Sequence, residues 1–108
     1  MTALRCLLIL AATVAVGCSG YAGPRSIVNE DPAVKIPEIK TAVNRGDRKA
    51  MPQLVKDLDS DDAAVRFYAV EALRRLTGET LGYDWTADDR HARRPAIARW
   101  EAYVAANP

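Results

Sequence analysis

The sequence has little of what several classes of protein require. The 108-residue chain contains one histidine and two cysteines, and its formal net charge at pH 7 is +1. A nearly neutral chain lacks the basic surface that drives non-specific binding to phosphate backbones, so we expect no nucleic-acid partner. The chain also has no glycine-rich phosphate-binding loop, and His91 has no neighbours at a metal-ligand spacing. We therefore predict no cofactor, no metal site and no catalytic residue.

The N-terminal residues predict where the protein resides. Arg5 gives the first few residues a positive charge, and residues 6–16 follow without any charge. This apolar run has the length of a signal-peptide core and is too short for a comfortable transmembrane helix. The quartet Ala15-Val16-Gly17-Cys18 comes next. It resembles the lipobox of bacterial lipoproteins, with Ala15 at a position where that family usually has leucine.

This resemblance implies a lipid on Cys18. In bacterial lipoproteins the cysteine thiol receives a diacylglyceryl group and a peptidase cuts before it, so residues 1–17 would be the signal peptide. Cys6 would leave with that peptide, and the mature domain would have no free thiol and no disulfide. Two or more acyl chains anchor a protein stably. We expect a membrane-anchored protein of the cell envelope. Ser19 follows the cysteine, and in the sorting rule of bacterial lipoproteins a serine at this position is compatible with the outer membrane. An unused lipobox would make the chain periplasmic or secreted.

The residues after the lipobox predict a flexible tether. Residues 18–33 contain Gly20, Gly23 and Pro24 among polar residues and show no helical or strand period. Such a tether would hold the folded part, residues 34–108, away from the bilayer. Three serines of the mature chain lie in this tether or in a predicted turn, and none stands beside a base as nucleophilic catalysis requires.

After the tether, the apolar residues recur at the spacing of a helix. Ile36, Ile39 and Val43 lie at positions i, i+3 and i+7, so we expect a first helix here. Pro37 is acceptable in its first turn, where a missing N–H costs nothing. Gly46 can end the helix in the left-handed conformation.

Two more helices are predicted from similar signals. Asp47 is a plausible N-cap for a short second helix with Pro52 near its start. We expect the third helix from about Asp62 to Leu76, with Ser60 or Asp61 as its N-cap. Its apolar residues cover more than one face, which indicates neighbours on more than one side.

The segment from Arg48 to Thr77 resembles a HEAT repeat. In that family the first helix carries an early proline, an acidic turn follows, and a Val-Arg pair opens a second helix with small residues at the contact. The matching positions are Pro52, Asp61, Val65, Arg66, Ala69 and Leu73. The resemblance implies that Arg66 lies back along its own repeat and meets the carboxylates of the turn.

One HEAT-like unit cannot bury both of its faces, so it needs a cover on each side. The helix at residues 36–45 would cover one side and the C-terminal segment the other. We expect Tyr83, Trp85 and Trp100 to seal that second side. Because proline disrupts a helix interior, the last helix should begin near Arg94 or Pro95.

These patterns together predict an all-α fold. We expect a short HEAT-like α-solenoid or helical bundle of about four helices, with a C-terminal capping helix. The leading functional hypothesis is an interaction or scaffold module that contacts an unidentified envelope protein. The alternatives are an accessory subunit of, or a weak catalytic domain in, an envelope enzyme system, and a helical domain that contacts anionic lipid.

A basic stretch near the C-terminus is the best candidate for a role beyond structure. It consists of Arg90, Arg93, Arg94 and Arg99. It could be a solvated helix face that pairs with Asp88, Asp89 and Glu101. It could also be a contact surface for phospholipid headgroups or an acidic partner, since tethering raises the local concentration.

Overall fold

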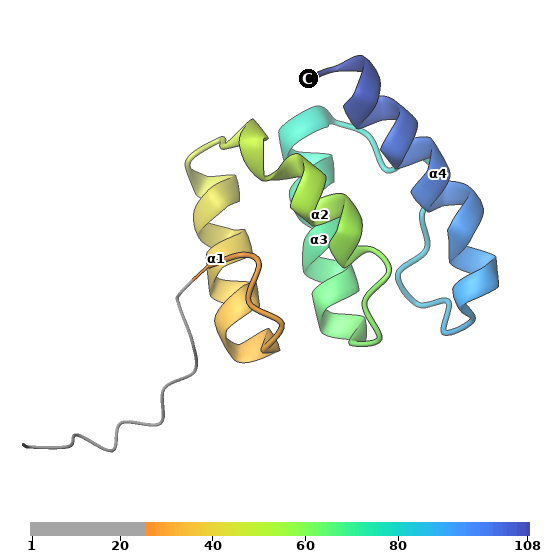
Figure 1. Ribbon diagram of the computed structural model, residues 1–108, viewed down its shortest axis with the longest axis horizontal. Coiled ribbons are helices and arrows are strands. Elements are labelled where there is room, and N and C mark those ends of the chain that lie inside the picture. Colours follow the sequence, from red (N-terminus) through yellow and green to blue (C-terminus); the bar gives the residue numbers. More distant parts are fainter. Residues whose placement is uncertain (1–25) are drawn as a thin grey trace, which may run out of the picture.

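The computed structural model describes residues 26–108, and this part of the chain is all-helical, with no strand. Its elements are α1 (Pro32–Asn44), the short 3₁₀ helix η1 (Arg48–Ala50), α2 (Met51–Asp57), α3 (Ala63–Thr77) and α4 (Arg90–Ala106) (Figure 1). The predicted all-α class with about four helices is confirmed. The predicted signal peptide and the lipobox with Cys18 lie outside the described residues. From residue 26 onward, every helix is too short or too polar to cross a membrane.

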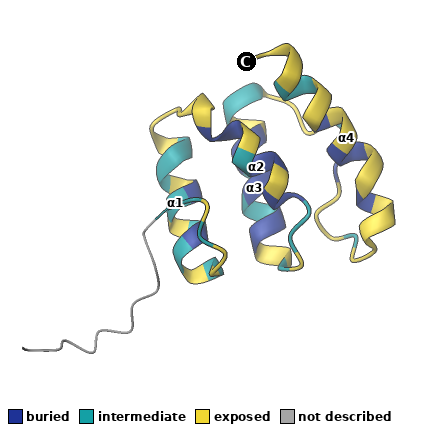
Figure 2. Ribbon diagram, viewed as in Figure 1, coloured by how far each residue is buried: buried dark blue, intermediate teal, exposed yellow. Residues whose placement is uncertain are grey.

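The helices are arranged around one central pair. α2 and α3 pack against each other, α1 packs against α3, and α4 packs against α2 from the other side (Figure 1). The α2–α3 pair is therefore covered on both sides, by α1 and by α4. Figure 2 shows the buried residues concentrated on α2, α3 and the facing side of α4. The side chains that are almost wholly inaccessible include Ile39, Leu54, Leu58, Val65, Ala69, Leu73, Ile97 and Trp100.

The first helix begins earlier than the predicted domain boundary. The carboxylate of Asp31 accepts a hydrogen bond from the backbone N–H of Ala33 at 2.9 Å, which caps α1 at Pro32. Pro37 consequently lies inside the helix and beyond its first turn. Ile27 packs against the core, so the end of the predicted tether belongs to the folded part. Gly46 has a φ of +63°, the left-handed conformation expected of it.

The cap of α3 differs from the prediction by one residue. Asp62 has an extended backbone, and its Oδ1 accepts from the N–H of Val65 at 3.0 Å. Ser60 instead accepts from the N–H of Asp62 at 3.1 Å, while Asp61 is exposed. The choice of Ser60 or Asp61 as N-cap was therefore wrong. Because Ser60, Asp61 and Asp62 are all of residue types that cap helices, the sequence does not fix which of them is the N-cap. The conformation of the folded turn decides the position.

The last helix also begins earlier than predicted. α4 begins at Arg90, where Asp89 caps it by accepting from the N–H of His91 at 2.9 Å, and Pro95 lies inside the helix. The expected start near Arg94 or Pro95 was wrong. The Arg93 guanidinium donates to the carbonyls of Ala87 and Asp88 at 2.8 and 2.9 Å, which ties the first turn to the loop before it. These bonds stabilise the turn despite the proline that follows.

Candidate interaction groove between α2 and α4

Aromatic residues fix the position of α4 against the central pair. Trp100 is fully buried, and its indole N–H donates to the carbonyl of Thr80 at 3.0 Å. The Tyr83 hydroxyl donates to the carbonyl of Leu58 at 2.6 Å, and burial raises the pKa of Tyr83 to about 12. Trp85 is 37% exposed and lies edge-on to Phe67. Trp100 and Tyr83 thus seal this side as expected, whereas Trp85 lies at its margin.

A buried arginine links the turn between α2 and α3 to the C-terminal segment. Arg66 donates to the carbonyl of Ser60 at 2.8 Å and to the carbonyl of Trp85 at 3.0 Å, and it pairs with Asp88 at 3.3 Å. The expectation that Arg66 meets the carboxylates of the turn was therefore wrong, although it does reach the turn's backbone. Asp61 pairs instead with Arg90, at 3.2 Å between Nη2 and Oδ1.

The four arginines of the basic stretch do not act as one group. Arg93 is buried and bonded to backbone carbonyls, and Arg99 donates to the carbonyl of Leu81 at 2.8 Å. Arg90 pairs with acidic residues of the α2–α3 turn, Asp59 and Asp61. Only Arg94 has a partner predicted from the sequence, Glu101 at 3.7 Å. The structure therefore divides the stretch between core support and surface ion pairs.

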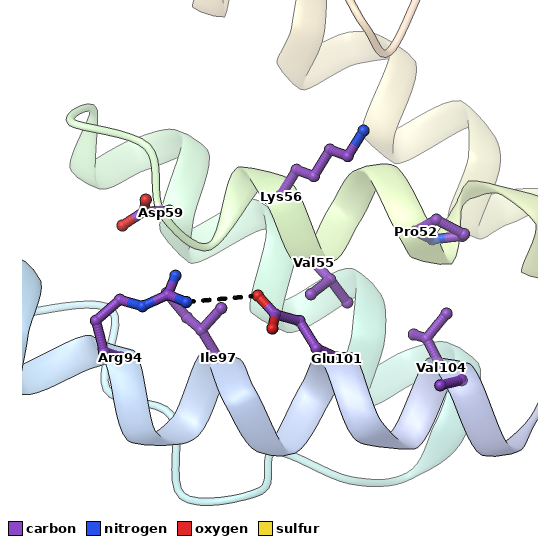
Figure 3. Close-up of a pocket in the computed structure, with 9 residues that line it drawn as sticks. Pro52, Val55, Lys56, Asp59, Arg94, Ile97, Glu101 and Val104 are labelled. Carbon is purple, nitrogen blue, oxygen red and sulfur yellow. Dashed lines mark ion pairs between the residues drawn. The ribbon is translucent and has the colours of Figure 1, made fainter.

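Between α2 and α4 the surface is hollowed into a groove. Its first part has a volume of about 570 Å³, and Figure 3 shows the side chains around it. Val55 and Ile97 are its buried apolar floor. The other lining residues are Pro52, Lys56, Asp59, Arg94, Glu101, Val104 and Ala105. Every lining residue comes from α2, from the turn after it, or from α4, so the groove exists only once these elements have packed.

The groove continues past the start of α2. A second hollow of about 450 Å³ shares Pro52 and Val104 with the first and adds Arg48, Lys49, Met51, Asn107 and Pro108. We call the two hollows together the α2–α4 groove. The sequence does not show that Val55 lines one hollow together with Ile97 and Val104, because these residues of α2 and α4 lie far apart along the chain.

Charges border the groove, and some of them are already paired. The Arg94–Glu101 pair lies along the α4 side (Figure 3). Asp59 pairs with Arg90 at 3.4 Å. Lys49 and Lys56 are exposed, and their side chains make no hydrogen bond or ion pair with any described residue.

A separate, polar hollow lies between the start of α1 and the end of α2. It has a volume of about 670 Å³, and a buried ion pair lines it: Lys35 Nζ lies 2.7 Å from Asp57 Oδ1, with only 2% and 3% of these residues exposed. Gln53 donates to the same oxygen at 3.1 Å, while Oδ2 has no hydrogen-bond partner within residues 26–108. Burial raises the pKa of the Asp57 carboxyl, and the bonds from Lys35 and Gln53 oppose that rise.

Sequence reasoning missed this ion pair. One signal was available, since Lys35 precedes Ile39 by four residues and Asp57 follows Leu54 by three, which places each charge on an apolar helix face. The described part of the chain contains no group of three histidine, cysteine or acidic residues that could hold a metal. His91 is exposed, and its imidazole has no hydrogen-bond or ion-pair partner in this part of the chain.

Comparisons with known proteins add no relative to these observations: no family model, curated protein or solved structure matches the chain.

Proposed function

We propose that this chain is a lipid-anchored protein of the cell envelope that binds a partner protein through its HEAT-like helical surface. The α2–α4 groove is the docking site. The observation that carries this proposal is the groove's construction: a buried aliphatic floor, Val55 and Ile97, bordered by charged side chains. A concave apolar surface with a few polar groups at its edge is the usual form of a binding site.

The arrangement of the central pair supports the HEAT-like part of the proposal. Val65, Ala69 and Leu73 are buried where α3 meets its neighbours. Pro52 lies in the first turn of α2, and Arg66 is bonded back to the turn between the two helices. A single unit of this kind, covered on both sides, offers one short surface, so the partner would be contacted by one face and not wrapped by a long solenoid.

Site-specific crosslinking in cells tests the groove. Ala105 lines the groove, and Ala102 is an exposed alanine on the same helix that lines neither hollow. A photoactivatable residue at Ala105 should give an adduct of one defined mass, and the same residue at Ala102 should give none. Equal adducts from both positions, or no adduct from Ala105 in a well-expressed protein, would refute the docking site.

Metabolic labelling with a fatty-acid analogue tests the anchor. The wild-type chain and Cys6→Ala should take up the label and sediment with membranes, because Cys6 lies in the proposed signal peptide. Cys18→Ala should do neither, since the acyl chains would have no thiol to bond. Label on Cys18→Ala at the wild-type level would contradict the anchoring proposal and leave the groove proposal standing.

A further inference from the structure

The chemistry of the groove selects among the ways in which a protein recognises a peptide. Addition of a strand needs an exposed sheet edge, and residues 26–108 contain no strand. Recognition of a proline-rich segment needs an aromatic-lined groove, and neither hollow of the α2–α4 groove is lined by an aromatic side chain of the described residues. A third mode lays the apolar face of an amphipathic helix into an aliphatic groove. Val55, Ile97 and Val104 suit that mode.

The unpaired charged side chains at the groove indicate which charge such a helix would carry. The two carboxylates at the groove already have cations: Asp59 has Arg90 at 3.4 Å, and Glu101 has Arg94 at 3.7 Å. Arg48 also has a partner, the carbonyl of Leu76 at 3.0 Å. Among the described residues that line the groove, Lys49 and Lys56 are the exposed cations without a side-chain partner, so the groove presents a positive border. An interface favours a partner of the opposite charge, because complementary potentials raise the association rate and exclude wrong partners.

We infer that the occupant of the α2–α4 groove is an acidic amphipathic helix of a partner protein. Its apolar stripe lies on Val55, Ile97 and Val104, and its carboxylates face Lys49 and Lys56. These two lysines are about two helical turns apart along the chain, so the matching acidic residues should show a similar spacing. This inference rests on the proposed docking function and specifies the chemistry of its partner.

Selection from a display library of random helix-forming peptides tests the inference, with the full chain in detergent micelles as the target. Enriched peptides should combine apolar residues at i, i+3 or i+4, and i+7 with acidic residues beside that stripe. They should crosslink from Ala105 and not from Ala102. Replacing the acidic residues of an enriched peptide by their amides should weaken its binding about tenfold, and added salt should narrow the difference.

Charge reversal supplies the matched control. Lys49→Glu/Lys56→Glu should lose the preference for acidic peptides and enrich basic ones. Arg45→Glu/Arg75→Glu makes the same change of charge at exposed cations that line neither part of the groove, and it should select the acidic peptides unchanged. Circular dichroism of both variants checks that each keeps its helical content.

Two results would overturn the inference. One is enrichment of peptides without excess acidic residues. The other is an acidic preference that survives the reversal at Lys49 and Lys56. Either result leaves the proposed docking function intact if the Ala105 crosslink forms in cells. Absence of that cellular crosslink removes the docking function itself, so the two failures are distinguishable.

Discussion

The two helices that flank the central α2–α3 pair are held by different chemistry. α1 is held by an apolar contact at Ile39 and by the buried ion pair between Lys35 and Asp57. α4 is held by the fully buried Trp100 and Ile97 together with hydrogen bonds to backbone carbonyls. The arginines of this second side, Arg66 and Arg93, donate mainly to main-chain oxygens.

This difference determines how each side responds to its surroundings. A backbone carbonyl does not titrate, so the bonds that hold α4 persist until the Tyr83 hydroxyl ionises at high pH. The α1 side contains one buried carboxyl, Asp57, and its raised pKa makes stability decline as that carboxyl ionises. We therefore expect the α1 side to be the electrostatically sensitive one and the α4 side to be the one governed by packing.

The largest expected effect comes from removing the packing of α4. Trp100→Ala leaves a cavity in the core and removes the indole hydrogen bond to the carbonyl of Thr80, and it should lower the free energy of unfolding by about 4 kcal/mol. Urea unfolding followed by circular dichroism measures this. Trp85→Ala is the control, because Trp85 is already 37% exposed and should cost much less. Equal losses in the two variants would mean that Trp100 is not the main contact of α4.

Breaking the ion pair of α1 should have the next largest effect. Lys35→Met leaves Asp57 buried without its cation, which should cost about 3 kcal/mol in the same urea measurement. The double variant Lys35→Met/Asp57→Leu should recover most of that loss, because two apolar side chains can replace a buried pair. A double variant no more stable than the single one would show that the pair stabilises the fold beyond satisfying each partner.

Alkaline unfolding tests the α4 side through Tyr83. Its pKa rises from the ordinary 10.0 to about 12 in the folded state, so between these values the folded state binds more protons than the unfolded state. The free energy of unfolding should therefore fall by about 2 kcal/mol from pH 10 to pH 12. Tyr83→Phe has no hydroxyl to ionise and should not show this fall. A parallel decline in both proteins would assign the effect to other groups.

The α1 side should show its own pH dependence at lower pH. Burial raises the pKa of Asp57 above its ordinary 3.8, so in this window the folded state again holds the extra proton. The contribution of Asp57 to stability is therefore largest below pH 3.8 and declines as pH rises through the folded pKa. The difference in unfolding free energy between wild type and Asp57→Asn, followed across this range, isolates that decline. A difference that grows with pH would reverse the sign and indicate a lowered pKa.

Much of the helical content followed from local signals in the sequence. The period of Ile36, Ile39 and Val43 indicated α1, and Gly46 marked its end correctly. The predictions were wrong where several neighbouring residues could cap the same helix, as at the start of α3. They were also wrong where a tertiary contact compensated for a residue that is locally unfavourable in a helix. Pro95 argued for a late start of α4, and the bonds made by Arg93 outweighed it.

The candidate site was less predictable than the helices. The stretch from Arg90 to Arg99 looked like a single basic surface, yet it separates into a buried arginine, a carbonyl-bonded one and two surface ion pairs. Lys35 and Asp57 were not paired from the sequence at all. Both outcomes depend on which distant residue stands opposite each side chain.

Local patterns were enough to predict the all-helical class, the apolar faces and the main turn residues, because helix period and turn chemistry act between neighbours along the chain. Which charges are buried, how α1 and α4 are held, and where an aliphatic groove with two unpaired lysines forms beside α2 depend on the folded arrangement of the helices. These features arise where segments far apart in sequence meet. Their energies come from burial and from partners that no local pattern contains.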